Sequence, residues 1–96
     1  MNEGTTIKKW NYGDYSSSNY GSHTQAVKVG ILVFYFSYDT IVAFDKGAES
    51  YCSENVWSTT TGKHLNWIEP DKKKRLNHSE FLDKLQDLLE EHKLDI

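Results

Sequence analysis

The segment that most constrains the fold is residues 31–38, which read Ile-Leu-Val-Phe-Tyr-Phe-Ser-Tyr. Nearly all of these side chains are β-branched, aromatic or otherwise apolar, a composition typical of a central strand with two buried faces. Such a strand needs partner strands beside it and other elements packed against its faces. The sequence therefore predicts a β-sheet with a hydrophobic core around this segment.

The residues on either side predict the other strands. Gly30 alone joins this segment to an alternating stretch before it. One residue is too short for a hairpin turn, so we expect a bulge in one long strand near 24–36. A tight turn after Tyr38 leads into a second strand near 39–45, and a third follows near 49–53. These segments predict an antiparallel meander of three to four strands.

Two helices are expected after the strands. Residues 59–68 predict a short helix, which ends because the residue before Pro70 avoids helical geometry. Asn77 and Glu80 form a variant of the capping box, and apolar side chains then recur at helical spacing over residues 78–92. The predicted fold class is α+β, a small antiparallel sheet of three to four strands covered by a C-terminal amphipathic helix, with one short extra helix.

The chain has 96 residues, enough for one core without disulfides. We expect a single domain over residues 1–96, with 1–6 frayed and 7–23 forming an ordered loop or a short edge strand plus loop. The predicted core draws apolar side chains from the strands and both helices: Ile31, Val33, Phe34, Phe36, Ile41, Ala43, Phe44, Leu65, Ile68, Phe81, Leu85 and Leu88.

The charge balance narrows the class of partner. The formal net charge is -3, and the one dense basic run is at 72–75. Domains that bind nucleic acid strongly are usually far more basic. Cys52 is the sole cysteine, which excludes an internal disulfide and a multi-cysteine zinc site. No apolar run approaches the ~20 residues that span a bilayer, and no signal-peptide core is present. We expect a cytoplasmic protein without membrane contact, metal or cofactor.

Residues 57–64, which read Trp-Ser-Thr-Thr-Thr-Gly-Lys-His, carry the richest chemistry. Hydroxyl groups and a glycine at the start of a helix suit an anion, because the first backbone N–H groups have no helical partner. In one interpretation Thr60, Lys63 and His64 supply a donor, a charge and a titratable group to an anion site. In the other, this is an ordinary helix cap with Trp57 buried as an anchor.

The aromatic N-terminal segment offers a second group of candidates. Tyr15 and Tyr20 are interleaved with Ser, Asn and Gly, as in many binding surfaces, although they could equally close one side of the sheet. His23 and His64 are also the minimum equipment for metal-independent cleavage of RNA. The basic run at 72–75 allows contact with phosphates or a role as a solvated connector.

Three blocks of sequence together resemble a known family. They lie at residues 15–23, 35–44 and 57–66 and contain Tyr-Gly-x-His, Phe-Ser-Tyr-x-Thr and Trp-Ser-x-Thr-Thr-x-Lys-His patterns. The chain is similar in these blocks to a family of small uncharacterised proteins encoded by bacteriophages and prophages. The resemblance implies a phage genome and therefore the cytoplasm of a bacterial host. It implies no biochemical activity.

These observations lead to three functional hypotheses. The first is a non-catalytic phage accessory protein that binds a host protein, such as a defence or replication component, through Tyr15, Tyr20, His23, Trp57, Thr60, Lys63 and His64. The second is a nucleic-acid or nucleotide binder that uses an anion site at residues 59–64. The third is a metal-independent nuclease. An exposed edge strand in so small a sheet also allows a homodimer.

Overall fold

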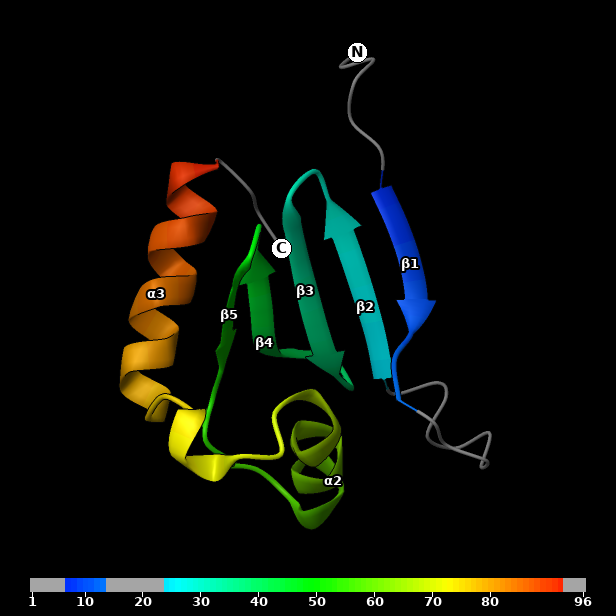
Figure 1. The fold of residues 1–96 in the computed structure, drawn as a ribbon, viewed down its shortest axis with the longest axis vertical. Helices are drawn as coiled ribbons and strands as arrows, with labels where there is room; N and C mark the ends of the chain where they lie inside the picture. The colour runs from blue at the N-terminus through cyan, green and yellow to red at the C-terminus, as the bar shows by residue number, and fades with distance from the viewer. Residues whose placement is uncertain (1–6, 14–23, 93–96) are drawn as a thin grey trace.

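A five-stranded antiparallel sheet forms the centre of the molecule (Figure 1). The structure is a computed structural model and describes residues 7–13 and 24–92. The strands follow one another in space in chain order: β1 (Ile7–Asn11), β2 (Thr24–Val29), β3 (Leu32–Ser37), β4 (Thr40–Lys46) and β5 (Glu49–Cys52). The expected antiparallel meander is therefore present. It has five strands rather than three to four, because residues 24–36 form two strands and residues 7–11 add an edge strand.

Each of the three tight hairpins begins its loop with a residue at positive φ. Gly30 and Gly47 have φ +61°, and Tyr38 has φ +57°. Gly30 and the next residue form a two-residue turn between β2 and β3, with Val29 paired to Leu32. The predicted bulge at Gly30 is therefore wrong. The physical reason is that glycine adopts the positive φ required at the first position of a type II′ turn, so two residues suffice to reverse the chain.

The bulge lies instead in β4, at Val42. Tyr35 pairs with Ala43 and Phe36 pairs with Ile41, so Val42 has no partner on β3. The extra residue places Val42 in the same core cluster as Ala43, while Phe44 belongs to the cluster on the opposite face. The bulge thus lets β4 bury apolar side chains against elements on both faces of the sheet.

Two helices pack on the two faces. Helix α2 (Thr59–Ile68) and helix α3 (His78–Glu91) are joined by a 3-10 turn, η1 (Lys72–Lys74). The bounds of α2 match the prediction, and α3 ends one residue before the expected position. The Asn77 cap at the start of α3 is confirmed, because its side chain accepts a hydrogen bond from the Glu80 backbone N–H at 2.9 Å. The Glu80 carboxylate accepts in return from the Asn77 side-chain amide at 2.7 Å. Neither described helix is long and apolar enough to cross a membrane.

The core consists of two clusters separated by the sheet. On the α3 face the cluster is Leu32, Phe34, Phe44, Phe81, Leu85 and Leu88. On the α2 face it is Val42, Ala43, Cys52 and Leu65. Figure 1 shows α3 running along the β5 side of the sheet and α2 at the end where the β3–β4 hairpin turns. Because α2 covers only that end, part of its face of the sheet is left open.

The predicted core is mostly confirmed, with one clear error. Leu65, Phe34 and Phe81 are fully buried, but Ile31 is 61% exposed because it is the second residue of the Gly30 turn. Val33, Phe36, Ile41 and Ile68 are only partly buried. Five buried apolar residues among those described lie outside the predicted core: Tyr12, Ala26, Leu32, Val42 and Cys52.

The contrast between Leu65 and Ile31 predicts opposite effects on stability. Replacing Leu65 by Ala should lower the free energy of unfolding by about 2–5 kcal/mol, because it leaves a cavity between α2 and the sheet. Replacing Ile31 by Ala should change it by less than about 0.5 kcal/mol, as for other exposed positions. Urea denaturation followed by tryptophan fluorescence measures both. Equal losses in the two variants would contradict the assignment of Ile31 to a solvent-exposed turn.

Candidate functional site

A buried polar cluster fixes α2 against the β3–β4 hairpin. The Ser37 hydroxyl lies 2.7 Å from His64 Nδ1 and 2.9 Å from the Thr61 hydroxyl. All three side chains are buried, and His64 is 0% exposed. Buried polar groups stabilise a structure only when they are hydrogen-bonded, so this cluster specifies one position of α2 on the sheet. His64 is therefore a structural residue that helps to hold α2 against the sheet.

A row of aromatic rings passes beneath α2 from one side to the other. The Tyr38 ring centroid lies 6.1 Å from that of His64, and His64 lies 6.4 Å from Tyr12. Tyr12 in turn lies 5.5 Å from both Tyr35 and Trp67. Tyr12 is buried, and its hydroxyl donates to the Phe36 carbonyl at 2.8 Å. The two ends of the row, Tyr38 and Trp67, are exposed.

The start of α2 is a capped helix terminus. The Ser58 side chain accepts a hydrogen bond from the Thr61 backbone N–H at 3.3 Å, so Ser58 is the N-cap of α2, as in the helix-cap interpretation of this segment. The Asn55 side-chain amide donates to the Ser58 carbonyl. Its nitrogen would lie 2.9 Å from a Cβ atom placed on Gly62. Because Asn55 is exposed and its side chain can move, this contact disfavours a side chain at position 62 only weakly. Thr60 is half-buried.

The predicted site residues fall into different environments. Lys63 is exposed on α2, whereas His64 is buried, so the two do not face one ligand together. Trp57 is half-buried and packs edge-on against the His78 ring at 5.0 Å, which fits the anchor interpretation. Tyr15, Tyr20 and His23 lie outside the described residues. The distance between His23 and His64, on which the nuclease hypothesis depends, is therefore not defined.

A small pocket opens between the start of α2 and the β3–β4 hairpin. Its volume is about 210 Å³, and its lining is dominated by hydroxyl groups and two aromatic rings: Ser37, Tyr38, Thr40, Val42, Trp57, Ser58 and Thr61. We call it the hydroxyl pocket. Part of the predicted 57–64 segment lines it. Its polar groups can form hydrogen bonds with a ligand, but the lining contains no charged side chain.

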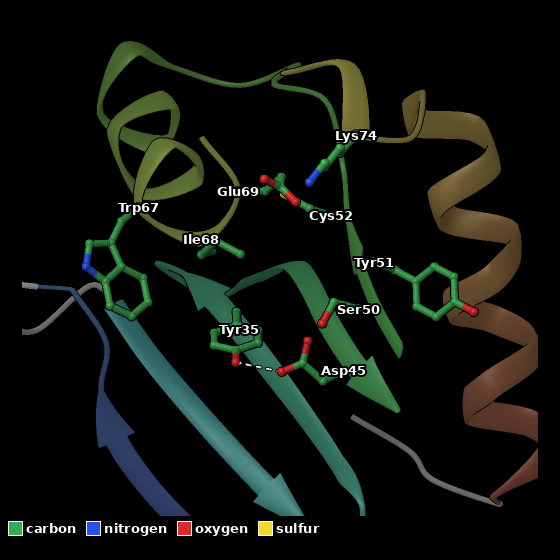
Figure 2. A pocket seen from close by; sticks show the side chains of 9 residues that line it. All are labelled: Tyr35, Asp45, Ser50, Tyr51, Cys52, Trp67, Ile68, Glu69 and Lys74. Atoms are coloured by element: carbon green, nitrogen blue, oxygen red, sulfur yellow. Dashed lines mark hydrogen bonds between the residues drawn. The ribbon is translucent and has the colours of Figure 1, made fainter. Parts of the chain in front are cut away.

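A second pocket, which we call the Asp45 pocket, lies on the open part of the same face (Figure 2). Its volume is about 140 Å³. At its base the Tyr35 hydroxyl donates to Asp45 Oδ2 at 2.7 Å. Burial, followed by the hydrogen bond and the charge of Asp45, raises the pKa of Tyr35 above its usual range. Tyr35 therefore stays protonated and holds Asp45 in place.

The wall of the Asp45 pocket comes from the end of α2 and the chain after it. Trp67 and Ile68 end the helix, Glu69 is its C-cap, and Lys74 belongs to η1. Figure 2 shows the Trp67 indole at one end of the pocket and the ring of Tyr51 turned away from it, toward α3. The pocket is thus built by β3, β4 and β5 below and the α2–η1 connection above.

The basic run at 72–75 is divided between two environments. Lys72, Lys73 and Lys74 are exposed on η1. Arg75 instead donates to the Glu69 carbonyl at 2.8 and 3.0 Å and to the Asn66 side chain at 2.9 Å. Arg75 therefore fastens the connection between α2 and α3, and only the three lysines remain available for a partner.

The described residues contain no group of three His, Cys, Asp or Glu side chains arranged to hold a metal ion. Cys52, which lines the Asp45 pocket, is 5% exposed. Burial raises the pKa of its thiol to about 11, while the nearby Arg75 charge acts in the opposite direction. The thiol is therefore protonated at neutral pH and unsuited to nucleophilic attack.

Three residues of these sites were not singled out from the sequence. Tyr38 could have been found by asking why a large residue begins a two-residue hairpin loop, where glycine is favoured. Asp45 is the last residue of the strand predicted near 39–45, and in the structure it lies in β4, opposite Val33. Trp67 has an apolar side chain at the end of a predicted helix, and nothing in the local sequence distinguishes it from a core residue.

Comparison with known proteins identifies a family whose function is unknown. Residues 4–84 match the model of a family of unknown function, DUF8033, so the chain belongs to this family. No curated protein and no solved structure matches the chain.

Cys52 should be unreactive in the folded protein. With a pKa of about 11, only about one thiol in a thousand is ionised at pH 8, and the side chain is also sterically covered. We expect labelling by 5,5′-dithiobis(2-nitrobenzoate) at pH 8 to be at least about 100-fold slower in native buffer than in 6 M guanidinium chloride. Equal rates in the two conditions would contradict this burial.

Proposed function

We propose that this family member is a non-catalytic, phage-encoded accessory protein that binds a protein of the bacterial host, such as a defence or replication component. The observation that carries the proposal is a set of exposed aromatic rings on the α2 side of the molecule. Trp10, Tyr38 and Trp67 are 41%, 46% and 50% exposed. We call these three residues the aromatic surface. Thr60 and Lys63, accessible on α2, extend it.

Exposed tryptophan and tyrosine side chains are well suited to protein interfaces. They are enriched at the centres of protein interfaces, where a large ring excludes water from both partners. Each ring at the ends of the row beneath α2 is supported by a buried neighbour. Tyr38 packs beside His64, and Trp67 packs against Tyr12. Rings held in this way lose little conformational entropy on binding, which favours affinity.

Two observations support a non-catalytic role. His64, the titratable residue of the predicted segment, is 0% exposed, so a bound substrate has no direct access to its ring. The Cys52 thiol is protonated and covered, as described above. Catalysis by either group would require the chain to open around it. A binding role requires only the surface that is already exposed.

A second candidate function is the binding of nucleic acid or a nucleotide. It is favoured by Lys8 and Lys28, which face each other across β1 and β2 on the sheet face that also carries Trp10. Exposed rings between lysines suit single-stranded nucleic acid, whose bases stack and whose phosphates pair with ammonium groups. The hydroxyl pocket at the start of α2 adds donors for a phosphate. The acidic side chains of α3 would repel nucleic acid from that side of the molecule.

Replacing Trp67 by Ala tests the proposal. We expect the affinity for the host partner, identified by cross-linking in host lysate and then purified, to fall at least about 30-fold, as at other interface tryptophans. Isothermal titration calorimetry measures the affinity. Leu82→Ala is the matched control, because Leu82 is 46% exposed on α3 and should be neutral.

The same preparation separates the two candidate functions. Equal losses in Trp67→Ala and Leu82→Ala, or a loss that follows a drop in melting temperature, would contradict a partner surface at α2. Binding of a short single-stranded oligonucleotide at low salt, with an affinity that falls steeply as salt rises, would favour the second candidate.

Tyr38 provides an independent test, because its backbone is strained. A positive φ costs a non-glycine residue about 1–2 kcal/mol, and Tyr38→Gly removes this cost while losing the packing on His64. We expect the free energy of unfolding to change by less than about 1 kcal/mol, since the two effects oppose each other. Affinity for the partner should fall about tenfold or more. Unchanged affinity in a stable variant would remove Tyr38 from the surface.

A further inference from the structure

The Asp45 pocket is lined by two carboxylates and one cation, Lys74, so its lining carries a net negative charge. Asp45 and Glu69 both line it and are both half-buried. The ion pairs among the described residues lie elsewhere, where Glu91 contacts Lys46 at 3.3 Å and His92 at 3.9 Å. Each carboxylate has one hydrogen-bond donor. Tyr35 donates to Asp45 Oδ2, and the Asp71 backbone N–H donates to Glu69 Oε2 at 3.3 Å. One oxygen of each group is left to accept from a ligand.

The orientation of Asp45 is set before any ligand arrives. The short hydrogen bond from Tyr35 holds one of its oxygens, and Figure 2 shows the other turned away from Tyr35, on the Ser50 side of the pocket. A carboxylate held in this way loses little freedom when it binds a donor. Ser50, which also lines the pocket, adds a hydroxyl acceptor.

The shape and the other lining groups limit the ligand. A volume of about 140 Å³ is well below the ~300–1,000 Å³ of sites for drug-sized molecules, so the pocket fits the end of one side chain. The Trp67 indole at one end provides a flat ring on which a planar cation can stack. A guanidinium group is planar, carries five N–H donors and is weakly hydrated, so it satisfies carboxylates and ring together.

We propose that the Asp45 pocket receives an arginine side chain of the partner protein, held between the Asp45 and Glu69 carboxylates with its guanidinium plane on Trp67. This inference rests on the proposed function, because it names the chemistry by which the partner is recognised. Trp67 then has two roles, as part of the aromatic surface and as the wall of the pocket.

Two lysines near the pocket make it selective for a single cation. Lys74 is part of the pocket wall and partly offsets the two carboxylates, and Lys28 lies on the same face as Asp45, separated from it by Val33 on β3. Their positive charges repel a partner segment that carries many basic residues. A single arginine with neutral or acidic neighbours meets much less repulsion. Removing Lys74 should therefore strengthen the binding of a cation. It would weaken the binding of an anion or a nucleic acid.

The test uses the full chain and a blocked amino acid. Nα-acetyl-arginine methylamide is titrated into ¹⁵N-labelled protein while the Trp67 indole N–H resonance is followed, with Nα-acetyl-citrulline methylamide as the neutral control of the same shape. We expect binding in the range of about 1–10 mM for arginine and none for citrulline, since an isolated side chain lacks the rest of the interface. Asp45→Asn, which keeps the acceptor for Tyr35, should weaken binding at least about fivefold, and Lys74→Ala should strengthen it about twofold.

Each outcome decides the inference separately from the proposed function. Equal shifts with arginine and citrulline, no effect of Asp45→Asn, or weaker binding in Lys74→Ala would overturn the arginine pocket. If Trp67→Ala still abolishes partner binding in that case, the proposed function stands without it. If arginine binds as expected but no protein partner depends on Trp67, the pocket stands and the proposed function fails.

Discussion

The hydrogen bonds that join Ser37 with His64 and with Thr61 are the interaction on which the rest of the α2 side depends. A helix of ten residues is marginal on its own and takes its position from tertiary packing. Leu65 supplies the apolar part of that packing, and the buried polar cluster removes alternatives to it, because a shifted helix would leave three buried polar groups without partners. The location of Trp67, and with it one wall of the Asp45 pocket, follows from this contact, whereas Tyr38 is placed by the β3–β4 hairpin and Trp10 by β1.

Comparison of the three hairpins shows that the fold does not require a tyrosine at position 38, because glycine occupies the equivalent position in the other two. The β2–β3 and β4–β5 turns use glycine at the first loop position, with φ +61°, and the β3–β4 turn has tyrosine there at φ +57°. A side chain kept in a strained backbone conformation needs a compensating contact or a role outside the fold. The contact with His64 supplies part of that compensation, yet 46% of Tyr38 remains exposed. The exposed remainder is the reason we place it in the partner surface.

The sequence predicted the helix boundaries well, because these depend on interactions between residues a few positions apart. The start of α3 followed from Asn77 and Glu80, and the extent of α2 from its cap and Pro70. Ile31 is exposed because it is the second residue of the Gly30 turn, which the bulge interpretation of Gly30 missed. The bulge at Val42 depends on pairing between strands, which no local pattern encodes. The sites were predicted least well for the same reason. Asp45 and Trp67 come from distant segments and line one pocket only in the folded protein. In the segment that is prominent in the sequence, His64 is buried and Trp57 is half-buried.

The distribution of charge explains why the α2 face, rather than an edge of the sheet, is the proposed interface. Strand β1 lies at an edge, and an antiparallel pair of such strands centred on Lys9 would place two ammonium groups opposite each other, with Lys8 beside them. This repulsion disfavours a homodimer through β1. The outer surface of α3 carries mostly acidic side chains and no exposed aromatic ring among the described residues. The α2 face combines exposed aromatic rings with the two carboxylates of the Asp45 pocket and the nearby lysines. A partner surface of this kind can discriminate by charge as well as by shape.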